Sequence, residues 1–133
     1  MSGIRPIDTG VSPHIGRYSD AVRVPSDHDL VVLSGTPGLD PTDGNRPDEF
    51  VAEARQAWTN VAAALDPAGA TLDHIVQVRT WLTGADDVAA YVQVRNEFIA
   101  HRPAYMLAVV PQVVRPDLRV EIEVLAAVPP DRP

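Results

Sequence analysis

The sequence predicts an α+β fold in which two helices cover one face of a mixed β-sheet. Three observations lead to this fold class. Proline is frequent at the start of the chain, but only Pro67 occurs within residues 48–102, so the helices are expected there. Apolar residues in this middle part recur at helical spacing, whereas other segments alternate or carry β-branched runs. The 133 residues suit one domain, which we expect to span 1–133.

The first helix is predicted over residues 48–66, where apolar residues three and four positions apart form one stripe. Asp48 and Glu49 suit its first turn, because carboxylates are stabilised at the positive end of the helix dipole. A proline and a glycine within residues 67–69 end it. A second helix is predicted over residues 86–101, with a less regular stripe that includes an arginine.

Strands are predicted from alternation and from β-branched residues. The predicted strands are 28–34, 75–82, 105–110 and 118–126, with a further strand at 19–24. The connection 35–47 is rich in glycine, proline, aspartate and asparagine, so we expect turns throughout it.

The strands 75–82 and 118–126 each have one apolar face, which we expect to pack on the helices. The second face carries mostly polar and charged residues: Gln77, Arg79, Trp81, Arg119, Glu121 and Glu123. A tryptophan among these charges indicates that the face is covered. The simplest cover for so small a chain is another copy of itself.

Composition excludes several classes of chemistry. The chain has no cysteine and its 11 basic residues are all arginines, so thiolate and Schiff-base catalysis and the Walker A lysine are excluded. The net charge of -7 disfavours nucleic acid and anionic membranes as partners. No apolar run approaches the length of a membrane-spanning helix, and residues 1–13 do not resemble a signal peptide. We therefore expect a soluble cytoplasmic protein.

No motif for a metal or a nucleotide is present. The four histidines are isolated from one another, and the glycines after residue 34 do not form a dinucleotide-binding pattern. Glu121 and Glu123 fit a solvated strand face, with Arg79 as the expected structural partner. They gain a functional interpretation only if that face is buried at an interface.

Four segments in a fixed order carry a resemblance to one family. Residues 15–22 resemble Gly-Pro-Tyr-Ser-x-Ala-Val, and residues 32–41 followed by Gly44 resemble the loop Ser-Gly-Gln-x-x-x-x-Pro-x-x-Gly. Residues 53–61 resemble the helix motif Gln-x-Arg-Gln-x-x-x-Asn-Val, and residues 118–126 resemble a final strand. The family is the Rid family of reactive intermediate deaminases, also called the YjgF type. The similarity covers about residues 16–128.

The resemblance implies a chorismate-mutase-like fold and a homotrimer whose sheets face inward as a central barrel, with a cleft between each pair of subunits. It implies hydrolysis of small imines or enamines without a metal or an organic cofactor. In the family, an arginine in the motif Pro-Ala-Arg-Ser/Thr binds the substrate carboxylate, and a glutamate on the last strand positions or activates water. Glu121 matches that glutamate.

The sequence departs from the family at the arginine. Tyr105 stands at its position, and a phenol cannot form the bidentate charged pair that a guanidinium offers a carboxylate. The chain therefore resembles a subgroup without this arginine, and standard 2-imino acid hydrolysis is expected to be weak or absent. Tyr18 matches a family tyrosine, Arg17 replaces its neighbouring proline, and Val92 stands at the position of a family asparagine.

Two function hypotheses follow. The first is an enzyme in which Glu121 and Tyr105 are catalytic. The predicted substrate-binding residues are Arg17, Tyr18, Gly35, Thr36, Arg79 and Trp81. Arg17 is the stronger candidate for a compensating cation, because the glutamates on the face of Arg79 are expected to neutralise the latter. The second hypothesis is a non-catalytic trimer that binds a small ligand; ribonuclease activity fits poorly with an acidic chain without lysine.

Overall fold

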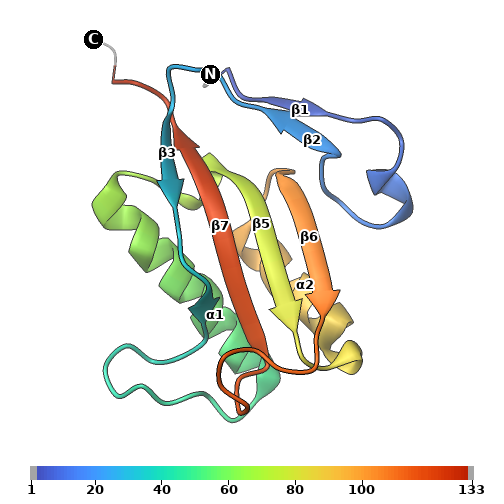
Figure 1. The fold of residues 1–133 in the computed structure, drawn as a ribbon, viewed down its shortest axis with the longest axis vertical. Helices are drawn as coiled ribbons and strands as arrows, with labels where there is room; N and C mark the ends of the chain where they lie inside the picture. Colours follow the sequence, from blue (N-terminus) through green and yellow to red (C-terminus); the bar gives the residue numbers. More distant parts are fainter. Residues whose placement is uncertain (1–2, 132–133) are drawn as a thin grey trace.

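The computed structural model describes residues 3–131 and contains one mixed sheet with both helices on the same side (Figure 1). The sheet order is β3 (Asp29–Val32), β7 (Val120–Val128), β5 (Ile75–Leu82) and β6 (Ala104–Val109). The β5 and β6 strands are parallel, and the other pairs are antiparallel. This arrangement confirms the predicted α+β class; the ends of the predicted domain 1–133 lie outside the described residues.

Both predicted helices form, each shorter than expected. They are α1 (Phe50–Leu65) and α2 (Val88–Phe98). After α1 the chain reaches Gly69, whose φ of 76° lies in the left-handed region that glycine adopts without strain. Short 3₁₀ helices lie at Ser12–His14, Asp66–Ala68, Leu72–His74 and Ala85–Asp87. Within residues 3–131, neither helix has the length and apolar character needed to cross a bilayer.

The core lies between the helices and one face of the sheet. Val78 and Ile122 from the sheet are fully buried there, as are Trp58 from α1 and Tyr91 from α2. The Tyr91 hydroxyl and the Thr80 hydroxyl are hydrogen bonded at 2.5 Å. The predicted apolar strand faces therefore pack on the helices, and burial of these side chains is the main force that holds the layers together.

A separate two-stranded ribbon precedes the sheet. It consists of β1 (Arg5–Ile7) and β2 (Ala21–Arg23). The second strand lies within the predicted strand 19–24, but it pairs with β1, which the sequence analysis does not identify. The ribbon lies beyond the start of β6 (Figure 1). The backbone N–H of Ser19 donates to the carbonyl of Pro103 at 3.0 Å, which fixes the ribbon and its loop beside β6.

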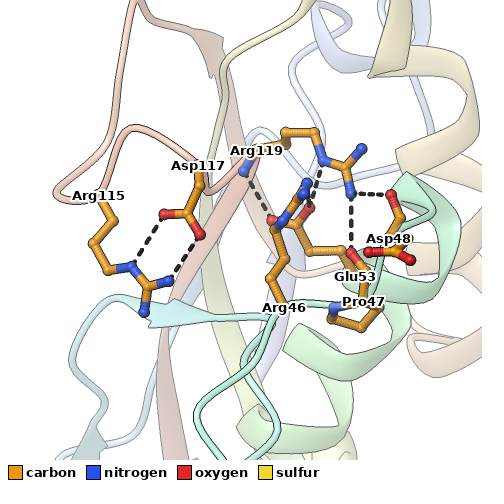
Figure 2. A network of polar contacts seen from close by, with 7 residues as sticks. All are labelled: Arg46, Pro47, Asp48, Glu53, Arg115, Asp117 and Arg119. Atoms are coloured by element: carbon orange, nitrogen blue, oxygen red, sulfur yellow. Dashed lines mark hydrogen bonds and ion pairs between the residues drawn. The ribbon is translucent and has the colours of Figure 1, made fainter.

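Two local predictions are wrong. A short strand, β4 (Thr36–Pro37), forms where only turns were expected, because this segment pairs with the edge of β7. Arg119 does not lie on the polar sheet face. Its backbone N–H and its Nε donate to the fully buried carboxylate of Glu53 on α1 at 2.8 Å and 2.6 Å (Figure 2). A buried carboxylate needs charged and hydrogen-bonding partners, and Arg119 supplies both.

Candidate functional site

The eight predicted site residues fall into two groups on opposite sides of the sheet. Tyr105 on β6 lies opposite Val78, which faces the helices, whereas Glu121 on β7 lies opposite Trp81, on the other face. Side chains alternate between the faces of a sheet, so the two predicted catalytic residues point away from each other within one chain. We call the side away from the helices the open face.

A cavity of about 440 Å³ lies beside Tyr105, between β6, α2 and the loop before β2. Its lining residues are Ile15, Gly16, Arg17, Tyr18, Val88, Val92, Arg95, Asn96, Tyr105, Met106 and Leu107. We call it the Tyr105 cavity. It brings together three of the predicted site residues, namely Arg17, Tyr18 and Tyr105.

Two tyrosines form one wall of this cavity. The ring centroids of Tyr18 and Tyr105 are 6.0 Å apart with an interplanar angle of 50°. Burial raises the pKa of Tyr105 to about 12, against the opposing effect of the nearby charges of Arg95 and Arg17. Its hydroxyl is buried and has no hydrogen-bond partner among the described residues. Tyr105 is therefore a neutral side chain whose hydroxyl proton is not used by any described residue.

Arg17 lines the cavity but also has a structural role. Its guanidinium donates to the carbonyl oxygens of Ile99 and Ala100 at 3.1 Å and 2.9 Å, just after the end of α2. Helix ends leave carbonyls without intrahelical partners, and a cation is favourable there. Arg17 thus ties the loop that carries Tyr18 to α2.

Arg95, which the sequence patterns do not single out as a site residue, lines the cavity with its guanidinium. Only 7% of this residue is exposed. Its guanidinium carbon lies 4.0 Å from the centroid of the Tyr105 ring, a cation–π geometry. The available signal was an arginine within the apolar stripe of the second helix. A charged residue at a position expected to be buried indicates either a structural ion pair or a binding site.

The open face holds the second group of predicted site residues. Thr36 of β4 and Glu121 of β7 lie on neighbouring strands, and Trp81 of β5 is the register partner of Glu121. The hydroxyl of Thr36 donates to the carbonyl of Ser34 at 2.9 Å. A Cβ atom on Gly35 would lie 2.9 Å from the carboxylate oxygen Oε1 of Glu121. The absence of a side chain at Gly35 leaves the space that the Glu121 carboxylate uses.

Arg79 belongs to the open face and is paired there. Its Nη1 lies 3.3 Å from Oε1 of Glu123, and its Nη2 donates to Gln77 at 3.4 Å. These contacts support a structural role for Arg79, as an ion-pair partner of Glu123. Arg79 does not form an ion pair with Glu121 among the described residues. Within residues 3–131, no group of three potential metal ligands gathers anywhere.

A second, larger cavity of about 720 Å³ lies beneath the β1–β2 ribbon. It shares Arg17 with the Tyr105 cavity and is otherwise lined largely by apolar residues, with Asp73, His101 and Arg102 at its polar points. His101 contacts the carbonyl oxygen of Ile75 at 2.7 Å. None of the buried side-chain atoms that lack a partner in the described residues lies here. The Tyr105 cavity is therefore the better candidate site.

Comparisons with known proteins decide the family. The family model described as Endoribonuclease L-PSP matches residues 9–128. A goat protein named 2-iminobutanoate/2-iminopropanoate deaminase is 34% identical over 128 residues, which cover 92% of this chain and 88% of the goat protein. A dust-mite protein of the same name, from Dermatophagoides farinae, is 33% identical and covers 96% of this chain and 99% of its own. The crystal structure of RidA from an Antarctic Psychrobacter is 30% identical, with a TM-score of 0.72 and coverage of 86% and 90%.

The chain belongs to the Rid family. The crystal structure of a Rid family protein from Yersinia pestis has the same fold, with a TM-score of 0.80 at 23% identity. The match covers 96% of this chain and 100% of that one. The family membership confirms the resemblance carried by the four sequence segments.

Tyr105 stands at the position where the resemblance to the family motif leads us to expect an arginine. The structure nevertheless supplies a guanidinium to the same cavity, from Arg95 on α2. Position 105 thus carries no charge, and Arg95 brings a guanidinium to the cavity that Tyr105 lines.

Proposed function

We propose that this Rid family chain forms a homotrimer that hydrolyses small imines or enamines in clefts between its subunits, without a metal or an organic cofactor. The observation that carries the proposal is the separation of the site into two halves. The Tyr105 cavity offers binding groups and no carboxylate, whereas the open face offers Glu121 beside Gly35. A cleft between two copies can join the cavity of one subunit to the open face of the next.

The surface of the open face supports self-association. Leu30 and Val32 on β3 are 62% and 71% exposed, and Met106 on β6 is 37% exposed. Trp81 is half-buried on the same face. Apolar side chains gathered on one sheet face favour a protein interface. A central barrel made from three such faces would cover them and bring Glu121 into a partly desolvated environment.

The proposed chemistry needs only a water and a proton acceptor. Water attacks the carbon of a protonated imine, a C–O bond forms, and one water proton passes to the Glu121 carboxylate. The resulting carbinolamine accepts this proton on nitrogen, and the C–N bond then breaks to release ammonia. The remaining hydroxyl loses its proton to solvent as the ketone forms. Tyr105 keeps its own proton and donates a hydrogen bond to the bound substrate.

We further propose that the preferred substrate differs from those in the names of the goat and dust-mite relatives. Tyr105 removes the guanidinium from β6, so the bidentate charged pair with a carboxylate cannot form at that point. The hydrolysis of 2-iminobutanoate and 2-iminopropanoate is expected to be slow compared with that by a relative that has the β6 arginine.

A competition assay tests the catalytic part. An amino-acid oxidase generates the imine in the presence of semicarbazide, and an active hydrolase lowers the yield of semicarbazone. Wild type is expected to lower the semicarbazone yield. Glu121→Gln is expected to hydrolyse the imine about 100-fold more slowly than wild type, and Glu123→Gln, on the same face, to hydrolyse it at the wild-type rate. Equal activity of Glu121→Gln and wild type would remove Glu121 from the mechanism.

Light scattering tests the assembly. A mass of three times the 14.4 kDa chain is expected for wild type and for both glutamine variants. A monomer at micromolar concentration contradicts the trimer. In a monomer the Tyr105 cavity and Glu121 cannot form one site, because they lie on opposite sides of the sheet.

Two other functions are outcomes of the same experiments. Binding of a stable ligand without imine hydrolysis would favour the non-catalytic trimer. Ribonuclease activity, which the family description names, is not proposed, because a chain with net charge -7 and no lysine has little affinity for a phosphate backbone. The cytoplasmic location stays a prediction from the sequence.

A further inference from the structure

Arg95 is a buried cation without an anion. Among residues 3–131, no carboxylate forms an ion pair with it, and its Nε atom is buried without a hydrogen-bond acceptor. The other arginines near the site are engaged differently. Arg17 donates to two carbonyl groups, and Arg79 is paired with Glu123. Burying an unpaired charge is costly, so a guanidinium in this position indicates that an anion completes the site.

The aromatic ring of Tyr105 packs against this guanidinium. The distance of 4.0 Å between the guanidinium carbon and the ring centroid is short enough for a stabilising cation–π contact. The Nε–H of this guanidinium has no acceptor among residues 3–131. The Tyr105 hydroxyl is also buried without a partner, so two residues that line one cavity each hold an unused donor. Together they match the acceptor oxygens of a carboxylate.

The rest of the cavity is mostly apolar. Val88 and Val92 on α2 and Leu107 on β6 line it, within a volume of about 440 Å³. This volume lies within the usual range for small-molecule sites and is generous for a two- or three-carbon side chain. Apolar walls favour a ligand that buries hydrocarbon.

We propose that Arg95 is the anion-binding residue of this site, and that it selects imines that carry both a carboxylate and a branched or longer apolar side chain. The substrate part of this inference rests on the proposed imine hydrolysis. The guanidinium reaches the carboxylate from α2 and not from β6, so the substrate is anchored at a different point of the cavity. In this way a family member with Tyr105 can still bind an anionic substrate, but one that differs from the substrates in the names of the goat and dust-mite relatives.

The binding experiment uses a stable 2-oxo acid in place of the short-lived imine. 4-Methyl-2-oxopentanoate and its methyl ester are titrated into the wild-type assembly by calorimetry at low ionic strength. The acid is expected to bind, and the neutral ester to bind about 10- to 100-fold more weakly, as expected for the loss of a charged hydrogen-bonded pair. Equal affinity for acid and ester overturns the inference, as does failure of the acid to bind.

Three variants locate the effect. Arg95→Met keeps a long apolar side chain and removes the charge, so it is expected to lose about 10- to 100-fold in affinity for the acid and nothing for the ester. Arg95→Lys is expected to retain part of the preference for the acid. Arg55→Met is the control, because Arg55 lies on the surface of α1 in an ion pair with Glu97. Unchanged affinity of Arg95→Met for the acid contradicts the proposed role.

Folding and turnover are measured separately. Melting temperature and light scattering establish that each variant is folded and assembled; if Arg95→Met does not fold, the acid-to-ester ratio of Arg95→Lys decides. A smaller ratio than in wild type supports the inference, and an equal ratio contradicts it. Acid binding that depends on Arg95 without imine hydrolysis would leave the binding role standing and remove the proposed enzyme. Imine hydrolysis that does not change in the Arg95 variants would support the proposed enzyme and contradict the anion-binding role of Arg95.

Discussion

A Cβ atom on Gly35 would lie 2.9 Å from the carboxyl carbon of Glu121, so the glycine and the carboxylate share one small space on the open face. The two residues meet because β4, which follows Gly35, pairs with β7 at Glu121. The atoms that a new methyl group would meet belong to the end of a flexible side chain. A substitution here can therefore move the carboxylate while leaving the backbone in place.

Gly35→Ala is expected to displace the Glu121 carboxylate and lower imine hydrolysis about 10- to 100-fold, less than the about 100- to 10,000-fold that a general acid or base contributes, because the carboxylate is moved and not removed. The melting temperature is expected to change little, because Gly35 does not have a positive φ. Gly84→Ala is the matched control, since its Cβ would meet only the end of the Asp87 side chain, with Oδ2 at 3.1 Å, and Gly84 does not line the Tyr105 cavity. Full activity of Gly35→Ala would show that the carboxylate position is not critical.

Glu53→Gln is expected to destabilise the fold by about 2 to 4 kcal/mol, because it leaves the guanidinium of Arg119 without its buried counter-charge. The partial exposure of the Arg119 side chain, 28%, keeps the cost below that of a fully buried pair. Denaturant unfolding measures it. Asp117→Asn removes the neighbouring exposed ion pair with Arg115 and is expected to have no measurable effect. Figure 2 shows both pairs.

Tyr105 is expected to ionise near pH 12, because burial raises its pKa to about 12. A raised pKa means that the folded chain holds this proton more tightly than the unfolded chain, in which the tyrosine pKa is about 10. The contribution to stability is complete below about pH 10 and is lost as the pH rises towards 12. The phenolate absorbance of wild type minus that of Tyr105→Phe measures the transition. A difference transition near pH 10 would contradict the burial of this hydroxyl.

Asp20 is expected to make the loop before β2 sensitive to acid. Backbone N–H groups, that of Thr9 foremost, donate to its carboxylate and hold its pKa well below the ordinary value of 3.8. The stabilising contribution is therefore present above this value and is lost as the pH falls below it. Hydrogen exchange of the Thr9 and Ser12 amides should be slower in wild type than in Asp20→Asn near neutral pH. The difference should disappear in acid, and equal exchange rates at neutral pH would contradict the role.

Local patterns in the sequence determined the fold class and the sheet face on which Arg79, Trp81 and Glu121 lie. Helical spacing placed α1 and α2 within a few residues of their observed bounds, and strand alternation put Glu121 opposite the core. Periodicity encodes such facts because it depends only on residues a few positions apart. The four ordered segments likewise determined the Rid family.

The tertiary structure alone decided which residues meet. Arg95 contacts Tyr105 because α2 packs against the sheet beside β6, and Gly35 approaches Glu121 because β4 pairs with β7 across more than eighty residues of sequence. The pattern that places a residue on a face does not specify its neighbour from another element. Long-range pairing and packing supply that information, and so the contact between Arg95 and Tyr105 became visible only in the folded chain.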